Sequence, residues 1–345
     1  MQHQDLPHQP TDRIDPDFTN AETFATLVEK EFAPTPTGAE ISGMQLVNYR
    51  VEEMPTLIDP ILQQAGLACL AGSSDTGKSS LLRQLAVSIV SGADDFLGFP
   101  INCRHQSVIF VSTEDEEKAV SYLLRRQTQG IPPQNLEKLR FIFNFKDLNE
   151  TLEKSLQRQP ADLVIIDCFA DCFIGDLKDT NKLREFLNKY QLLSAQHNCL
   201  FLFLHHTGKR TEDMEPSKNN LLSGQGFEGK MRLVIELRTD PMDPTLRHLC
   251  IVKGNYLSGD MKRDSYVLHF NEQEFSFTNT NERMPFEKLA KRYDSGDEDK
   301  AKYREAVQLK NEGLTHDEVV EKLKLKNRGR VTDLINRGKA KGWDD

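Results

Sequence analysis

Two kinds of apolar segment are missing from this sequence: a run long enough to cross a membrane and the core of a secretory signal. No stretch reaches the roughly 18 apolar residues of a membrane-spanning helix, and the first 19 residues are polar. Cysteine is scarce, with six in 345 residues. Only Cys168 and Cys172 form a close pair, and the second pair of a zinc site is missing. We therefore expect a cytoplasmic protein without membrane contact, whose cysteines are reduced core thiols rather than disulfides or metal ligands.

Positive charge is also in deficit. Lys and Arg number 44 against 53 Asp and Glu, which gives a formal net charge of −9 and argues against a surface that binds nucleic acid everywhere. Apolar residues make up 38% of the chain, and a chain of this length can bury a core of about 200–250 residues and still carry a smaller module. We expect a tail and linker over residues 1–40 with a short helix near Ala21–Phe32, a core over 41–285, and a helical module over 294–345.

Strand-like and helix-like segments alternate through the middle of the chain. Helical periodicity is clear at Lys78–Val90 and again around Leu183–Leu193. The apolar runs predict strands at residues 67–71, 108–111, 141–145, 163–166 and 200–204. Continuously apolar strands separated by amphipathic helices are typical of a parallel sheet with helices on both faces. Strands without helices between them follow at 231–237, 248–253, 265–270 and 274–277, which predicts an antiparallel extension of this α/β fold.

The strongest motif is Gly-Ser-Ser-Asp-Thr-Gly-Lys-Ser at residues 72–79, which matches the P-loop (Walker A) pattern G-x-x-x-x-G-K-[ST] in full. It follows an expected strand and opens an expected helix, where backbone N–H groups and the helix dipole favour a bound phosphate. Lys78 is expected to contact the β- and γ-phosphates of ATP, and the Ser79 hydroxyl to hold Mg²⁺. The predicted nucleotide-binding residues are Gly72, Ser73, Ser74, Asp75, Thr76, Gly77, Lys78, Ser79 and Ser80.

Two acidic residues follow apolar strands downstream of the P-loop. Asp167 ends the run Leu-Val-Ile-Ile-Asp and is the expected second support of Mg²⁺. Glu114 follows an earlier strand, where a carboxylate is able to orient and deprotonate the water that attacks the γ-phosphate. Because Glu116 and Glu117 come soon after it, a solvated acidic loop is the alternative interpretation of Glu114.

The order of these motifs resembles the RecA-like ATPases, and within them the RepA-type hexameric replicative helicases of plasmids and their relatives in mobile elements. The resemblance rests on the P-loop, on Ser-Thr-Glu-Asp at 112–115, on Ile-Ile-Asp at 165–167 and on His-His-Thr-Gly-Lys at 205–209. It extends over about Leu46–Phe277. It implies a RecA-like core that hydrolyses ATP, a homo-oligomeric ring, here a hexamer, with nucleotides between subunits, and single-stranded DNA passing through the ring.

The resemblance also assigns roles to single residues. Glu114 matches the family's catalytic glutamate and Asp167 its Walker B aspartate. His206, with His205, matches the polar position that senses the γ-phosphate at the end of the next strand. Lys78, Glu114 and His206 are therefore the expected catalytic set. A surface turn at a strand end is the alternative interpretation of the two adjacent histidines.

A Gly-rich stretch at 221–232 resembles the region near the central channel of helicase rings. Its glycines suit mobility, and Lys230 and Arg232 supply positive charge for a phosphate backbone. An ordinary flexible loop has a similar composition, so that interpretation stays open.

The strand at 248–253 corresponds to one that carries a Lys-x-Arg pair in hexameric helicases, where the pair reaches the nucleotide of the neighbouring subunit. Lys253 is present here, but Asn255 replaces the arginine. The trans-acting residue is then Lys253 alone, Arg232 or Arg238. Since such an arginine contributes about 10³–10⁵ in rate, slow ATP hydrolysis in isolation is expected.

The C-terminal module is basic in an acidic chain. Residues 300–345 hold 12 Lys and Arg against 8 Asp and Glu, which leaves the remainder at −13. Helices are expected at Ala301–Asn311, after a capping box that begins at Thr315, and at Arg328–Ala340, with the spacing of a helix-turn-helix. The basic residues expected to contact duplex DNA are Lys326, Arg328, Arg330, Arg337 and Lys339. A docking module with solvated charges is the alternative.

These motifs together predict a Mg²⁺- and ATP-dependent RecA-fold motor that forms a ring and acts on DNA as a helicase. Two alternatives remain open. One is a RadA- or KaiC-like ATPase of recombination or regulation that does not separate strands. The other is an ATP-gated adaptor with negligible turnover, whose tail docks a partner.

Overall fold

The structure is a computed structural model that describes residues 40–208, 211–290, 295–325, 327–340 and 342–343. The short helix expected near Ala21–Phe32 lies outside the described residues, as do Lys209 and Lys326. Among the described helices, none has the length and apolar composition needed to cross a bilayer.

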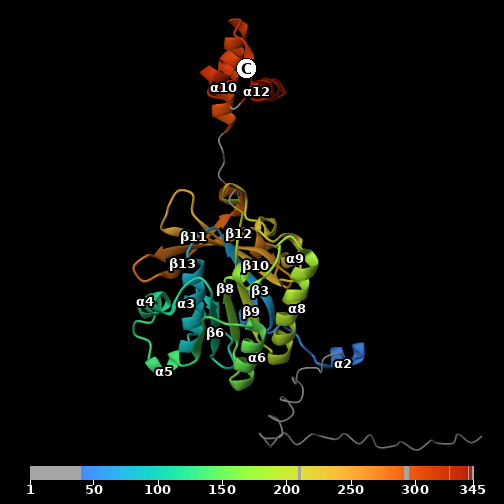
Figure 1. Cartoon of the computed structure of the whole chain (residues 1–345), viewed down its shortest axis with the longest axis vertical. Coiled ribbons are helices and arrows are strands. Elements are labelled where there is room, and N and C mark those ends of the chain that lie inside the picture. Colours follow the sequence, from blue (N-terminus) through green and yellow to red (C-terminus); the bar gives the residue numbers. More distant parts are fainter. Residues whose placement is uncertain (1–39, 209–210, 291–294, 326, 341, 344–345) are drawn as a thin grey trace, which may run out of the picture.

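The core is built on one nine-stranded sheet, in the order β13-β12-β11-β10-β3-β9-β8-β6-β7 (Figure 1). The six strands from β10 to β7 run parallel, and β11, β12 and β13 continue the sheet antiparallel. The bounds are β3 Gly66–Gly72, β6 Val108–Ser112, β7 Leu139–Ile142, β8 Leu163–Asp167, β9 Leu200–His206, β10 Leu233–Thr239, β11 Leu246–Gly254, β12 Asp264–Asn271 and β13 Ser276–Pro285. The predicted mostly parallel sheet with an antiparallel extension is confirmed.

Two details differ from the sequence-based expectation. The strand expected at 141–145 lies two residues earlier, as β7. The strand expected to open the antiparallel extension, β10, pairs parallel with β3, with Leu233 opposite Ala68. Parallel pairing needs a long crossover, and the connection between β9 and β10 supplies one because it contains helix α9, Gly224–Glu228. The antiparallel part therefore begins one strand later, at β11.

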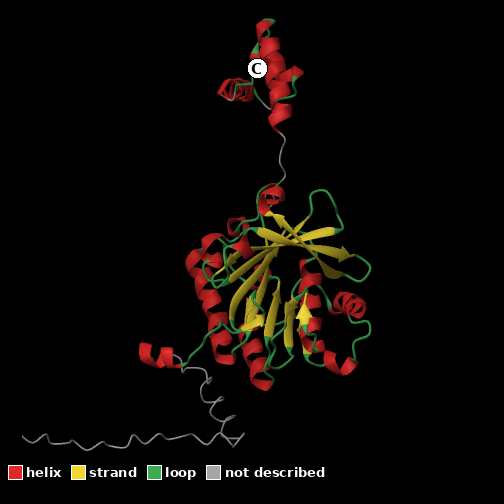
Figure 2. Cartoon of the chain, turned by 180° about the vertical axis from the view of Figure 1, so that it is seen from behind, coloured by secondary structure: helices red, strands yellow, loops and turns green. Residues whose placement is uncertain are grey.

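Helices cover both faces of the sheet and form two apolar clusters. Helices α3 (Lys78–Ser91), α4 (Glu117–Gln127) and α5 (Pro133–Leu136) pack on one face. Helices α6 (Leu148–Arg158) and α8 (Thr180–His197) pack on the other, with α7 (Phe169–Cys172) and α9. Figures 1 and 2 show this three-layer arrangement from opposite sides. Because the parallel strands are buried on both faces, their residues are continuously apolar, as the sequence pattern indicated.

Smaller elements complete the described part of the core. Helix α2 (Gly43–Asn48) begins at a capping box of Ser42 and Gln45. Two short hairpin-like pairs are formed by β1 (Thr56–Ile58) with β2 (Leu62–Gln63) and by β4 (Asp95–Phe96) with β5 (Phe99–Pro100). Single turns of 3₁₀ helix lie at Thr211–Asp213, Lys218–Asn220, Asp260–Lys262 and Phe286–Lys288.

The C-terminal module folds around its own apolar cluster. Its helices are α10 (Ser295–Asn311), α11 (His316–Lys322) and α12 (Arg328–Ala340). Thr315 and Glu318 form both bonds of the capping box that starts α11. Gly338 of α12 lies against the ring of Tyr303 so closely that a Cβ there would be 2.2 Å from a ring carbon. The module therefore depends on a close helix-to-helix contact that only glycine permits.

Candidate active site

The P-loop occupies the turn between β3 and α3. Gly77 caps the N-terminus of this 14-residue helix with φ +87°, in the left-handed region that favours glycine. A Cβ at Gly72 would lie 2.4 Å from the backbone oxygen of Leu237, so this position also requires glycine. The helix N-terminus has backbone N–H groups without intrahelical partners and the positive end of the helix dipole. The turn therefore has the geometry of an anion-binding loop.

The antiparallel strands hold this loop from behind. Arg247 of β11 is buried and donates from Nε to the backbone oxygen of Thr76 at 3.1 Å. The ring of Phe277 on β13 lies so close to Gly77 that a Cβ there would be 2.8 Å away. Gln84 of α3 is hydrogen-bonded to the backbone N and O of Phe277. The extension thus fixes the conformation of the P-loop, a role that the sequence analysis did not find.

Lys78 is buried at the start of α3. Its Nζ donates to the backbone oxygen of Ser73 at 2.5 Å. Burial lowers the pKa of its amine, and the carboxylates of Asp167 and Glu114 oppose that shift. The amine therefore lies inside the loop, in reach of the position that a phosphate would take.

Asp167 ends β8 beneath the P-loop and is buried. Burial raises its pKa to about 6, and a side-chain hydrogen bond with Ser79 opposes the shift. Its Oδ1 is buried without a hydrogen-bond partner. Buried carboxylate oxygens need partners, and oxygen donors suit Mg²⁺. A carboxylate with an open oxygen beside a serine hydroxyl therefore fits the donor set that Mg²⁺ requires here, as the sequence predicted for both residues.

A buried arginine that the sequence analysis missed stands behind this pair. Arg83 of α3 forms an ion pair with Asp115 at 3.6 Å, and its guanidinium charge lowers the pKa of Asp167. It falls on the apolar face of α3, which is the one local sign that it is not an ordinary surface cation. Its contact appears only once α3 packs against the ends of β6 and β8.

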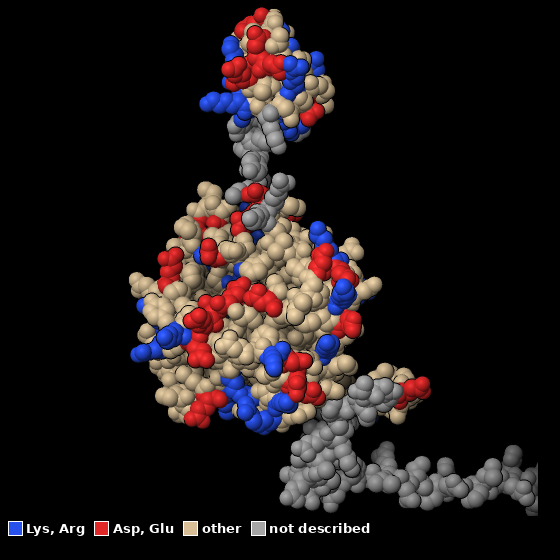
Figure 3. Space-filling view, viewed as in Figure 1, with Lys and Arg blue, Asp and Glu red and all other residues tan. Residues whose placement is uncertain are grey.

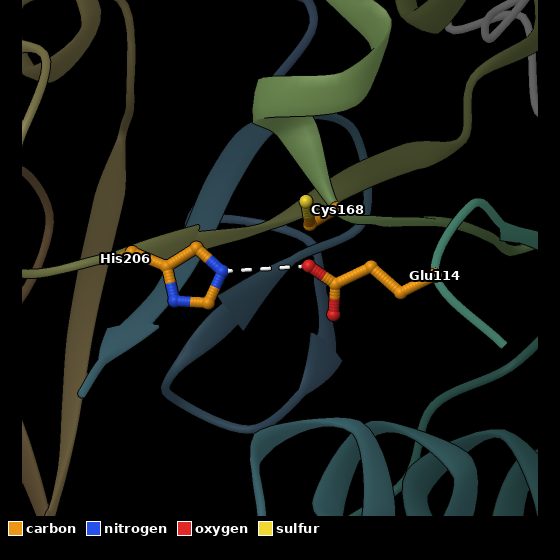
Figure 4. Close-up of side chains that lie close together, drawn as sticks. All are labelled: Glu114, Cys168 and His206. Carbon is orange, nitrogen blue, oxygen red and sulfur yellow. Dashed lines mark ion pairs between the residues drawn. The ribbon is translucent and has the colours of Figure 1, made fainter. Parts of the chain in front are cut away.

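Glu114 and His206 face each other across the end of the sheet (Figure 4). The Nε2 of His206, at the end of β9, lies 3.6 Å from Oε1 of Glu114, after β6. The Glu114 side chain is half exposed and that of His206 is 28% exposed, so both are open to solvent and to a ligand. The thiol of Cys168, directly after Asp167, lies with them: the three donor atoms are all within 4.8 Å of one another. The sequence predicted the first two residues here and not the cysteine.

His205 lies apart from this group, although the sequence analysis placed it with His206. Its ring is fully buried between Phe169 and Phe227, 5.2 and 4.7 Å away by ring centroids, and its Nε2 is 2.8 Å from Oγ of Ser223. Burial lowers its pKa to about 4. Successive strand residues point to opposite sides, so only one of the two histidines can face the site.

An open cleft of about 460 Å³ lies beside Glu114. It is lined by residues 112–118, 143–145 and Asp171, and five of these side chains are carboxylates. Figure 3 shows how acidic side chains gather on the visible face of the core. Such a surface attracts cations and repels free anions.

The cations expected near DNA or a neighbouring nucleotide lie elsewhere. Lys230, Arg232 and Lys253 lie at the end of the sheet where β3 begins, opposite the P-loop, since Leu233 pairs with Ala68 and Val234 with Lys253. Lys230 donates from Nζ to Asn188, and Lys253 pairs with Glu228 at 2.9 Å. Arg232 is exposed.

Arg238 is tied inside its own subunit. Its Nε lies 3.0 Å from Oε1 of the buried Glu236, and its terminal nitrogens donate to the backbone oxygens of Met214 and Thr211. Because these partners occupy its guanidinium, Arg238 cannot reach the nucleotide of a neighbouring subunit in this conformation.

The Gly-rich stretch is more ordered than expected. It folds into α9, and a Cβ at Gly226 would lie 3.1 Å from Cα of Thr180 on α8. Phe227 is fully buried. Here the glycine serves close packing of two helices, not the mobility that its composition suggested.

The basic residues of the C-terminal module differ in their freedom. Arg328 pairs with Asp317, and Arg337 lies over the ring of Trp343 with 5.7 Å from its guanidinium carbon to the centroid. Arg330 and Lys339 are exposed.

Comparisons with known proteins agree with this architecture. Residues 37–212, just over half of the chain, match a protein family described as AAA domain. No curated protein shows a significant match. Among solved structures, one whose title describes an ATPase domain superposes with a TM-score of 0.52 at 13% identity, over 75% of this chain and 98% of that one; at this identity the likeness shows the fold alone. The chain therefore belongs to the AAA domain family, as a P-loop ATPase with a RecA-like fold.

Proposed function

We propose that the chain hydrolyses ATP with Mg²⁺ and uses the free energy to move on DNA as a hexameric ring, in the manner of the RepA-type helicases that its motif order resembles. The observation that carries the proposal is the meeting of Ser79, Asp167, Glu114 and His206 at one end of the sheet. Ser79 lies in α3, Asp167 and His206 end β8 and β9, and Glu114 follows β6. These strands follow β3 in the order β3-β9-β8-β6. Ligand sites of open α/β sheets form at the carboxyl ends of such strands.

Each side chain has a distinct part in the proposed reaction. Lys78 and the P-loop amides bind the β- and γ-phosphates, and Ser79 and Asp167 are the residues that would hold Mg²⁺. The ion, when bound, neutralises charge that develops on the phosphates. Glu114 accepts a proton from the attacking water. His206, 3.6 Å from that carboxylate, contacts the γ-phosphate and registers whether it is present.

Two variants test the hydrolysis. Lys78→Ala is expected to abolish turnover and to weaken nucleotide binding. Glu114→Gln is expected to bind ATP within about threefold of wild type while turnover falls about 10²–10⁴-fold, the usual range for a general base. ATPase assays paired with nucleotide titrations measure both, and Glu117→Gln, an exposed carboxylate on the first turn of α4, is the matched control. Normal turnover in Glu114→Gln would show that Glu114 does not activate the attacking water.

The action on DNA is supported by two groups of cations. Arg184, Lys230 and Arg232 line a hollow of about 290 Å³, and the module adds Arg330 as an exposed cation. Phosphate contacts make binding weaken with salt. We expect a Lys230→Ala and Arg232→Ala double variant to bind single-stranded DNA more weakly, and Arg330→Ala to bind duplex DNA more weakly, each with a shallower salt dependence by fluorescence anisotropy.

One observation favours a second candidate, the ATP-gated adaptor. Lys253 and Arg238 are both paired within their own subunit, and Asn255 stands where the related helicases carry arginine. The adaptor predicts assembly on a non-hydrolysable ATP analogue with negligible turnover, even with single-stranded DNA. The motor predicts turnover that DNA accelerates and unwinding of a forked duplex; a RadA- or KaiC-like ATPase predicts turnover without unwinding.

A further inference from the structure

We propose that Glu114, Cys168 and His206 form a site for a thiophilic divalent cation such as Zn²⁺, and that this cation inhibits the enzyme. The inference rests on the proposed function, because Glu114 is the residue assigned there to activate water. The site is distinct from the Mg²⁺ position at Ser79 and Asp167, which offers oxygen donors only.

The donor atoms already lie near the separations that zinc needs. Bonds of about 2.0–2.3 Å in a tetrahedral site place the donor atoms roughly 3.3–3.8 Å apart. Nε2 of His206 and Oε1 of Glu114 are 3.6 Å apart, and Sγ of Cys168 lies within 4.8 Å of one donor atom of each of these two residues. Closing the site needs a movement of about 1 Å or less, and the half-exposed Glu114 side chain is free to make it.

The backbone holds the three donors in place. Cys168 follows β8, His206 ends β9 and Glu114 follows β6, and β8 is hydrogen-bonded to both other strands. The backbone N of Cys168 donates to Oγ1 of Thr113 at 2.8 Å. Thr113 in turn donates to Asp171 at 2.7 Å, and the Cys168 thiol lies 3.5 Å from the same carboxylate. The Thr113 contact holds the backbone of Cys168 in place, whereas the thiol gives up its contact with Asp171 when the metal displaces its proton.

The chemistry of the three donors selects the metal. A thiolate, an imidazole and a carboxylate are ligands that Zn²⁺ accepts, whereas Mg²⁺ prefers oxygen alone. When the metal–sulfur bond forms, the thiol releases its proton to solvent. Three protein ligands leave a fourth position for water. The acidic cleft beside Glu114 favours entry of a cation.

The expected consequence is reversible inhibition. A metal on Glu114 occupies the carboxylate that must accept a proton from the attacking water. ATP hydrolysis therefore stops while the nucleotide can still bind, and a chelator restores turnover.

The test titrates the metal-free full-length chain with Co²⁺ and with Zn²⁺ in the absence of nucleotide. Co²⁺ reports sulfur coordination through its thiolate charge-transfer absorption, and Zn²⁺ is measured by competition with a chromophoric chelator. We expect one Zn²⁺ per chain and a charge-transfer band in the wild type. Cys168→Ser should lose the band and raise the Zn²⁺ dissociation constant by a factor on the order of 100.

Three further variants make the result specific. Cys172→Ser, a neighbouring half-buried cysteine, should keep the band and the affinity. His206→Asn and Glu114→Gln, on the more exposed ligands, should weaken Zn²⁺ binding even if Cys168→Ser fails to fold. Equal Zn²⁺ affinity in the wild type and these two variants, or no band in the wild type, would overturn the site. Because no nucleotide is present, failure of ATP hydrolysis leaves this result standing.

Discussion

A side-chain hydrogen bond with Ser79 lowers the pKa of Asp167, and Oδ1 of the Asp167 carboxylate is buried without a hydrogen-bond partner. A contact between the first turn of α3 and the end of β8 thus joins the two residues on which the metal chemistry depends. It forms because the β3–α3 turn returns across the carboxyl ends of the neighbouring strands.

The first prediction concerns the pH dependence of Mg²⁺. Burial raises the pKa of Asp167 to about 6, so its carboxyl takes up a proton as the pH falls through that value. Since a metal ligand must be deprotonated, Mg²⁺-dependent ATP binding should weaken between pH 7 and pH 5, with the midpoint moving lower as Mg²⁺ rises. Titrations of a fluorescent ATP analogue over this range measure it.

The variant Asp167→Asn tests whether the Asp167 carboxyl is the group that titrates near pH 6. We expect it to lose about tenfold or more in Mg²⁺ affinity and to show no transition near pH 6. The exposed Asp176→Asn should behave as wild type. A transition of full size that persists in Asp167→Asn would assign the titration to another group.

Sequence reasoning found the parts of this site that are local in the chain. The P-loop is continuous, and Asp167 and Glu114 directly follow apolar strands, so pattern alone marks them. Arg247 and Phe277 hold the loop from 171 and about 200 residues away, and no local pattern reports such pairing. Cys168 is a buried free thiol, as the sequence predicted, but its nearness to Glu114 and His206 depends on which strands lie side by side, and no local pattern reports that.

The second prediction concerns Gly77. Alanine there places a Cβ 2.8 Å from the Phe277 ring at φ +87°, so both a clash and backbone strain arise. We expect a loss of about 1–3 kcal/mol in the free energy of unfolding and a loss of ATP binding. Gly98→Ala separates the two causes, since Gly98 has φ +82° with its nearest contact at 3.8 Å. Gly98→Ala should cost less and keep ATP binding.

The third prediction concerns His205. Burial lowers its pKa to about 4 from 6.5, so the unfolded chain binds a proton more readily than the folded one. Stability from this residue is fully present above pH 6.5 and is lost as the pH falls to 4, by about 3 kcal/mol. Denaturant unfolding at pH values from 4 to 7 gives the free energy of unfolding at each pH. This free energy should depend less steeply on pH in His205→Asn than in the wild type. His105→Asn, at an exposed histidine, should keep the wild-type dependence of the free energy of unfolding on pH. A weaker pH dependence in that variant would argue against His205 as the group responsible.

The fourth prediction concerns the C-terminal module. Gly338→Ala forces a Cβ to 2.2 Å from the Tyr303 ring. We therefore expect the free energy of unfolding of the module to fall by roughly 2–3 kcal/mol and its unfolding midpoint to move to a lower denaturant concentration. Trp343, the one tryptophan of the sequence, packs on Tyr303 at 5.9 Å between ring centroids, so its fluorescence follows this module. Gly329→Ala, on an exposed part of α12, should stay within about 1 kcal/mol. Unchanged fluorescence transitions in Gly338→Ala would contradict the packing.

A crystal structure with Mg²⁺ and a non-hydrolysable ATP analogue tests the central claim most directly. We expect the triphosphate to lie along the backbone N–H groups of residues 72–79, with the ion between Ser79 and Asp167 and the terminal phosphate facing Glu114 and His206. A nucleotide bound elsewhere, or one bound with Glu114 and Asp167 turned away from it, would contradict the account.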